Sequence, residues 1–250
     1  MKRLRVAYER FTSCSGCQLT LLNCEGELAR LAGTCDFISF SMASSRADDG
    51  GPLDLALVEG SISRPEELGR LLELRRRADL LAAVGACALS GGVNVLDDRD
   101  RSLACARVYG DSARQMNTFP PQPLKRFVKI DLEIAGCPPE EEDYLATLGA
   151  LARGGIADLP SYAVCMECRW QENLCLLIEK KLPCLGPVTR AGCRAKCPSF
   201  GVVCEGCRGL AAEANLEEGV RLLLEMGLSE REVRALIGRF AGRILENHWS

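Results

Sequence analysis

The sequence predicts an α/β protein with a parallel, doubly wound sheet, followed by a cysteine-rich module and C-terminal helices. Up to about residue 155, short apolar runs alternate with segments of helical apolar spacing, as expected for strands joined by helical crossovers. Eight of the fifteen cysteines then fall within the 43 residues from Cys165 to Cys207. We therefore expect three parts, at residues 1–157, 158–210 and 211–250.

The elements of the first part follow from these apolar runs. Strands are predicted at residues 4–8, 35–40, 53–58, 80–84 and 128–134. Helices are predicted at residues 18–31, 64–77 and 138–153, the last two opening on proline followed by acidic residues. Two turn-rich stretches, at residues 41–52 and 110–123, are long enough to be functional loops or interface arms.

Four cysteines follow strands of the predicted sheet. Cys14 and Cys17 come after the first strand, Cys87 after the fourth and Cys137 after the fifth, each with a glycine within two residues. Ligands of parallel sheets bind beyond the carboxyl ends of the strands, and glycine lets the backbone approach a ligand closely. These four thiols are therefore expected to converge on one four-thiolate metal site.

The remaining scattered cysteines have a simpler interpretation. Cys24, Cys35 and Cys105 lie in a predicted helix, a strand and a loop, without a neighbouring glycine or partner cysteine. A buried cysteine is often a small apolar packing residue. We interpret these three in that way.

The second part carries eight thiols, enough for two four-ligand sites. The cysteines are Cys165, Cys168, Cys175, Cys184, Cys193, Cys197, Cys204 and Cys207. Two zinc ions and two 4Fe-4S clusters both satisfy this number. The Cys197-Pro198 pair, typical of ferredoxin motifs, favours iron, and so does an excess of lysine and arginine that would offset anionic clusters. Which cysteines share a cluster stays open.

Composition excludes several other classes. The net charge of −3 and the lack of a basic stripe argue against a nucleic-acid partner, and the longest apolar run, residues 80–89, is too short to span a membrane. The charged first ten residues resemble no secretory or twin-arginine leader, so a cytoplasmic location with reduced thiols is expected. The single histidine, His248, is expected to be an exposed tail residue, and no catalytic triad or nucleotide-binding motif is present.

Several of these motifs resemble a known family. The segments at residues 14–22, 58–62, 84–88 and 136–139 resemble the small subunit of nickel-iron hydrogenases, whose domain is shared by a complex I cluster subunit. The segments at residues 184–193, 197–198 and 204–209 are similar to the cytoplasmic group 3 enzymes, which reduce NAD(P), F420 or a heterodisulfide reductase. The resemblance covers residues 3–210.

The resemblance implies a flavodoxin-like domain with a proximal 4Fe-4S cluster on Cys14, Cys17, Cys87 and Cys137, facing a nickel-iron large subunit. It further implies two 4Fe-4S clusters in the module and a flavin- or cluster-containing acceptor subunit. Glu59 matches an acidic position of the family, with a proton-path or interface role as one interpretation and an exposed strand-end acid as the other.

Two alternatives remain. One is a relay subunit of another oxidoreductase complex, such as a complex I-like one. Its cluster subunit, however, has adjacent cysteines at the first site and lacks the eight-cysteine module. The other is a zinc-binding structural or interaction protein.

The C-terminal part is predicted to be helical. Ser229 and Glu232 form a capping-box signature that opens a helix through about Leu245. Its apolar face comprises Val233, Leu236, Ile237, Phe240 and Ile244. Packing against its own domain is the preferred interpretation over binding a partner.

Overall fold

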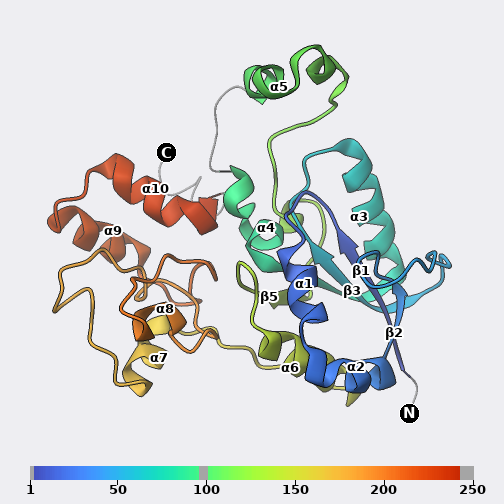
Figure 1. Cartoon of the computed structure of the whole chain (residues 1–250), viewed down its shortest axis with the longest axis horizontal. Coiled ribbons are helices and arrows are strands. Elements are labelled where there is room, and N and C mark those ends of the chain that lie inside the picture. Colours follow the sequence, from blue (N-terminus) through green and yellow to red (C-terminus); the bar gives the residue numbers. More distant parts are fainter. Residues whose placement is uncertain (1–2, 96–100, 243–250) are drawn as a thin grey trace.

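The structure, a computed structural model, describes residues 3–95 and 101–242. Figure 1 shows the sheet domain on one side and the cysteine-rich module with the C-terminal helices on the other. The strands are β1 (Leu4–Arg10), β2 (Cys35–Ser39), β3 (Leu53–Glu59), β4 (Ala78–Val84) and β5 (Leu132–Ile134). They form one parallel sheet in the order β2-β1-β3-β4-β5, the flavodoxin-like order. The predicted fold class is confirmed.

The fifth strand is shorter than predicted. The expected strand at residues 128–134 forms β5 only over Leu132–Ile134, which pairs with Ala82–Val84 at the edge of the sheet. The preceding apolar residues instead pack against the core after the short helix η4 (Leu124–Arg126). Apolar composition therefore reported burial here, while pairing was limited by the edge position.

The predicted helix at residues 18–31 is wrong as one continuous element. The chain forms α1 (Gly16–Leu22), the 3₁₀ turn η1 (Glu25–Glu27) and α2 (Leu28–Thr34). The break falls at Cys24, whose ψ of 51° leaves the helical region. Both helices still bury apolar residues against the sheet, because Leu21 and Leu31 belong to the same core cluster.

Helices cover both faces of the sheet. On one face, α1 and α2 pack with α6 (Glu141–Ala152), and on the other α3 (Pro65–Arg77) packs with α4 (Gly85–Ser90). The central strand β3 is buried along nearly its whole length. This two-sided core, typical of doubly wound sheets, places the loops after β1, β4 and β5 at one edge.

The module contains little regular structure. Its helices are α7 (Val164–Trp170) and α8 (Lys196–Ser199), and its small core includes Val164, Ala195 and Cys204. Four of its cations bind carboxylates of the sheet domain, in the pairs Arg190–Glu133, Arg194–Glu142, Lys196–Glu140 and Arg208–Asp143. These cations therefore join the two bodies, which corrects the expectation that they serve only to offset cluster charge.

The C-terminal helices are α9 (Leu216–Glu225) and α10 (Glu230–Ala241). The capping box is confirmed, since Ser229 and Glu232 cap each other's backbone amides. α10 shares a core with the module but also packs against α4 and η2 (Gly92–Val95), where Ser90 Oγ donates to Phe240 O. It therefore bridges both bodies rather than packing on its own part alone. Ile244, Leu245 and His248 lie outside the described residues.

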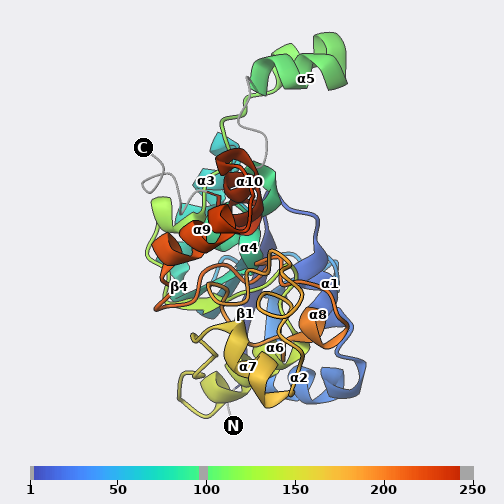
Figure 2. The ribbon, with the colours of Figure 1, turned by 90° about the vertical axis from the view of Figure 1, so that its left-hand side faces the viewer.

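The two turn-rich stretches differ in structure. Residues 41–52 are irregular and pinned to the body by the pairs Arg5–Asp49, Arg46–Asp36 and Arg77–Asp48. The stretch at 110–123 begins as η3 (Gly110–Gln115), which follows α5 (Arg101–Tyr109). Figures 1 and 2 both show α5 projecting away from the rest of the molecule.

Candidate metal centres

The four strand-end cysteines lie together at the carboxyl edge of the sheet. Cys14 precedes α1, Cys17 lies in its first turn, Cys87 lies in α4 and Cys137 follows β5. Burial raises the pKa of Cys17, and nearby Glu59 and the other three thiols raise it further. Burial likewise raises the pKa of Cys87 to about 12, with Cys137 and Cys14 adding to the effect. Since each thiol senses the charge of the others, the predicted convergence is present in the fold.

Glycines at this edge leave room for the thiols. Gly85 has a φ of +82°, and a Cβ there would overlap Cys17 Sγ. Gly136, with a φ of +147°, accepts a hydrogen bond from Ala86 N at 2.8 Å and so ties the loop after β5 to the start of α4. Any larger residue at either position would displace a thiol-bearing loop.

Glu59 is a buried carboxylate beneath this site. Its side chain is only 1% exposed, which overturns the interpretation as an exposed strand-end acid. Oε2 accepts a 2.8 Å hydrogen bond from Gln18 N, whereas Oε1 has no hydrogen-bond partner among the described residues. Burial raises the pKa of Glu59 above its usual range. The carboxylate therefore orients the start of α1 and keeps one oxygen free of hydrogen bonds.

Other residues of this layer escaped the sequence analysis. Tyr144 on α6 donates to Cys17 O at 2.8 Å, and its hydroxyl lies 2.8 Å from that of Tyr8 on β1. Gln18 Nε2 donates to Tyr8 O at 3.1 Å. These contacts join residues far apart in the chain, and a tyrosine within an apolar strand carries no local signal for such a role.

The eight module thiols fall into two groups. Burial raises the pKa of Cys165 to about 11, with contributions from Cys184, Cys168 and Cys175. A separate set surrounds Cys207, because burial, Cys193 and Cys197 raise the pKa of Cys207 to about 11.

Cys204 lies between the two groups. Burial raises its pKa to about 12, and both Cys184 and Cys207 contribute. Its backbone N–H also donates to Cys184 Sγ at 3.3 Å. Cys204 therefore completes four thiols around Cys207 while contacting the group around Cys165.

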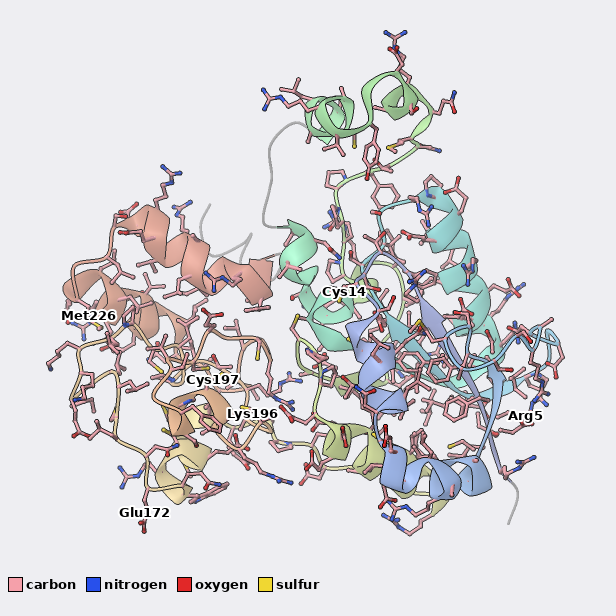
Figure 3. All side chains as sticks on the ribbon, in the orientation of Figure 1. Arg5, Cys14, Glu172, Lys196, Cys197 and Met226 are labelled. Atoms are coloured by element: carbon pink, nitrogen blue, oxygen red, sulfur yellow. The ribbon has the colours of Figure 1, made fainter. Side chains whose placement is uncertain are left out.

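The three groups follow one another in space. Cys207 also senses the charge of Cys137, which links its group to the strand-end site, and Cys204 links the same group to Cys184. Figure 3 shows Cys14 on the sheet domain and Cys197 within the module. The group of Cys193, Cys197, Cys204 and Cys207 thus lies in the middle.

A second buried carboxylate supports the middle group. Glu167 on α7 accepts hydrogen bonds from Gly192 N at 2.8 Å and from Ala195 N at 3.1 Å. Its carboxylate thereby fixes the loop that carries Cys193. The sequence analysis treated Glu167 as one surface charge among several, because nothing local distinguishes a buried acid inside a cysteine motif.

The remaining cysteines divide. Cys24 and Cys35 are buried in the sheet-domain core, 3% and 2% exposed, as expected of packing residues. Cys105 lies on α5, not in a loop, and is only partly buried. The interpretation of Cys105 as a core residue is therefore wrong, because α5 projects from the body.

All three thiol groups have the same donor chemistry. Each supplies sulfur ligands only, the donor set of a 4Fe-4S cluster, so these residues fit that group. Within residues 3–95 and 101–242, no three His, Cys, Asp or Glu side chains lie close enough to hold a single metal ion. The thiols are thus spaced more widely than ligands of one tetrahedral zinc ion.

A parallel sheet with four thiols at its carboxyl edge, followed by an eight-thiol module, defines the class as an electron-transfer subunit of the hydrogenase small-subunit type. The chain belongs to the family described as NADH ubiquinone oxidoreductase, 20 Kd subunit, which matches residues 14–151. The sequence resemblance to hydrogenase small subunits is thereby confirmed.

Curated relatives match along most of the chain. The chain is 35% identical to the sulfhydrogenase 2 subunit delta of Pyrococcus furiosus over 95% of this chain and 99% of that protein. It is 29% identical to a subunit of the F420-non-reducing hydrogenase vhu of Methanocaldococcus jannaschii, covering 95% and 94%. The NAD-reducing hydrogenase HoxS subunit delta of Cupriavidus necator is 29% identical over 64% of this chain and 83% of its own length.

Solved structures share the fold. A chain of an NAD⁺-reducing [NiFe]-hydrogenase in the H₂-reduced state matches with a TM-score of 0.55 and 26% identity, over 64% of this chain and 96% of its own. A chain of the Ni-Fe-Se hydrogenase of Desulfomicrobium baculatum matches with a TM-score of 0.59 and 18% identity, over 87% and 97%. Among the described helices, none combines the length and apolar character needed to cross a membrane.

Proposed function

We propose that this chain is the electron-transfer small subunit of a cytoplasmic group 3 nickel-iron hydrogenase. It relays electrons between the nickel-iron site of a separate large subunit and a redox partner through three 4Fe-4S clusters. The observation that carries the proposal is the succession of three thiol groups, linked by Cys137 with Cys207 and by Cys204 with Cys184. Similarity to hydrogenase subunits over nearly the whole chain supports it.

The three groups assign the ligands. Cys14, Cys17, Cys87 and Cys137 would hold the proximal cluster, and Cys193, Cys197, Cys204 and Cys207 the middle one. Cys165, Cys168, Cys175 and Cys184 would hold the outer cluster. When bound, the clusters supply one-electron redox chemistry. The same proposal divides the chain at residues 157 and 210.

The chain's own residues position and insulate this relay. Glu59, Gln18 and Tyr144 fix the backbone around Cys17, and Glu167 fixes that around Cys193. Backbone amides close to the thiols tune a cluster's potential, as local charge and burial also do. The chain contributes no catalytic residue for hydrogen cleavage, which belongs to the large subunit.

The two ends of the relay face different partners. Cys14 and Cys137 are exposed at the proximal end, where the large subunit would sit. Around the outer group, Trp170, Ile178 and Phe200 are 63%, 66% and 82% exposed. An apolar surface of this kind suits a protein partner. We assign it to a flavin- or cluster-containing acceptor subunit, linked to NAD(P), F420 or a heterodisulfide reductase.

Anaerobic purification of the chain with its co-expressed partner subunits tests the proposal. We expect about twelve irons per chain, a larger nickel-containing subunit in the same complex and hydrogen-dependent reduction of a viologen dye. A colourless protein with about two zincs and no iron would support the structural zinc protein instead. Iron without a nickel-bearing partner would favour a complex I-like relay.

A further inference from the structure

The helical arm, defined as residues 101–117, stands apart from the body of the protein. It consists of α5 and η3, which pack on each other, and η3 is the only described element against which α5 packs extensively. Two views at right angles show α5 projecting beyond α3 and α4 (Figures 1 and 2). A nine-residue helix without tertiary packing is marginal in water. The arm therefore requires a surface to pack against.

The arm carries apolar side chains that the rest of the chain does not cover. Val108 and Tyr109 are 73% and 54% exposed, and Met116 is 38% exposed. α5 and η3 also enclose a concavity of about 600 Å³ lined in part by Cys105, Ala106 and Met116. Such a feature offers a seat for an apolar side chain of another protein.

Both ends of the arm are anchored beside the proximal thiols. Before it, Asn94 Nδ2 donates to Thr12 O at 2.9 Å, two residues ahead of Cys14. In the same turn, a Cβ on Gly92 would lie 2.9 Å from Cys87 N, so η2 packs closely on α4. After the arm, Phe119 N donates to Ser63 O at 2.8 Å. The arm therefore rises from the rim of the proximal site.

We propose that this arm is a clamp that docks on the nickel-bearing large subunit. The inference rests on the proposed function and extends it to a specific contact surface. A protein seated over exposed Cys14 and Cys137 lies next to the anchors of the arm, so the two surfaces are continuous. The redox acceptor belongs at the outer thiol group, at the other end of the relay. The large subunit is therefore the partner that the arm is placed to hold.

Co-purification of the complete complex tests the clamp. We expect the double variant Val108→Asp/Tyr109→Asp to retain about tenfold less large subunit than the wild type, because charge on a docking face opposes burial. Replacing residues 101–117 by a short Gly-Ser linker should have the same effect. Iron per chain should stay at the wild-type value in both, since no proposed ligand lies in the arm.

A matched control and distinct outcomes decide the inference. Leu72→Asp on α3, a side chain 49% exposed and outside the arm, should leave the large subunit bound. Wild-type retention of the large subunit in both arm variants would overturn the clamp. So would a change only in self-association by light scattering, which would assign the arm to a second copy of this chain. A wild-type preparation without a nickel-bearing partner would overturn the proposed function itself, and the clamp with it.

Discussion

At the scale of single residues, the proximal site rests on groups that a fold without a metal centre would avoid. Glu59 is buried with one oxygen unpartnered, and the Oε1 atom of Gln18 also lacks a hydrogen-bond partner within the described chain. Buried polar atoms without partners are costly. Both residues adjoin Cys17, so their cost is concentrated at the four strand-end thiols, as expected where function constrains packing.

Substitution of one strand-end cysteine should remove one cluster. We expect Cys87→Ala to lose about four irons per chain and to stop hydrogen-linked dye reduction, because a cluster needs its four thiolates. Cys24→Ala removes a buried core thiol and should keep the iron of the wild type. Iron assay and dye reduction check both variants, and equal losses of iron would contradict the division of the cysteines.

At the scale of elements, short helices position the thiols while longer ones build the body. α4 spans only Gly85–Ser90, yet it carries Cys87 and receives α10 through Ser90 and Phe240. α10 in turn packs on the module through Val233 and Ile237. One C-terminal helix therefore links the α4 element of the proximal site with the module.

The cap of α10 should contribute measurably to this link. Ser229→Ala removes the side-chain acceptor for Glu232 N, and we expect a loss of about 1 kcal/mol in the free energy of unfolding. Ser229→Asp should restore most of it, since aspartate is an equally good cap. Denaturant unfolding measures the difference, and equal stability of the alanine variant and the wild type would show that the helix is held by packing alone.

At the scale of the whole molecule, two bodies are held together by charge as well as by apolar packing. Three of the four ion pairs between them start at α6 or just before it, at Glu140, Glu142 and Asp143. Only the Asp143–Arg208 pair is fully buried, and Arg208 Nε also donates to Ala191 O at 2.7 Å. Arg208 directly follows Cys207, so this pair sets the position of the middle group relative to the sheet.

Breaking the buried pair should cost far more than breaking an exposed one. Asp143→Ala leaves Arg208 buried without its partner, and we expect a loss of about 3–5 kcal/mol in the free energy of unfolding. Glu142→Ala removes the exposed partner of Arg194 from the same helix and should cost at most about 1 kcal/mol. Urea unfolding compares the two, and similar losses would show that the bodies are held by apolar contacts.

Pairs of cysteine substitutions test the assignment of the module thiols. Cys165→Ala combined with Cys175→Ala should lose about four irons, because both serve the outer cluster. Cys165→Ala combined with Cys197→Ala should lose about eight, because they serve different clusters. Iron content per folded chain, checked by circular dichroism, separates the two, and a reversed order of losses would refute the assignment.

By itself, the sequence determined the class of sheet and the identity of the strand-end thiols. Strand period and apolar runs are local properties, and parallel strands bring their carboxyl ends to one edge whatever their order. The tertiary structure decided what depends on distant contacts. It set the break at Cys24, the short β5, the burial of Glu59, the grouping of the module cysteines and the Asp143–Arg208 pair. Each of these joins residues far apart in the chain or depends on how its element packs, and no local pattern records such partners.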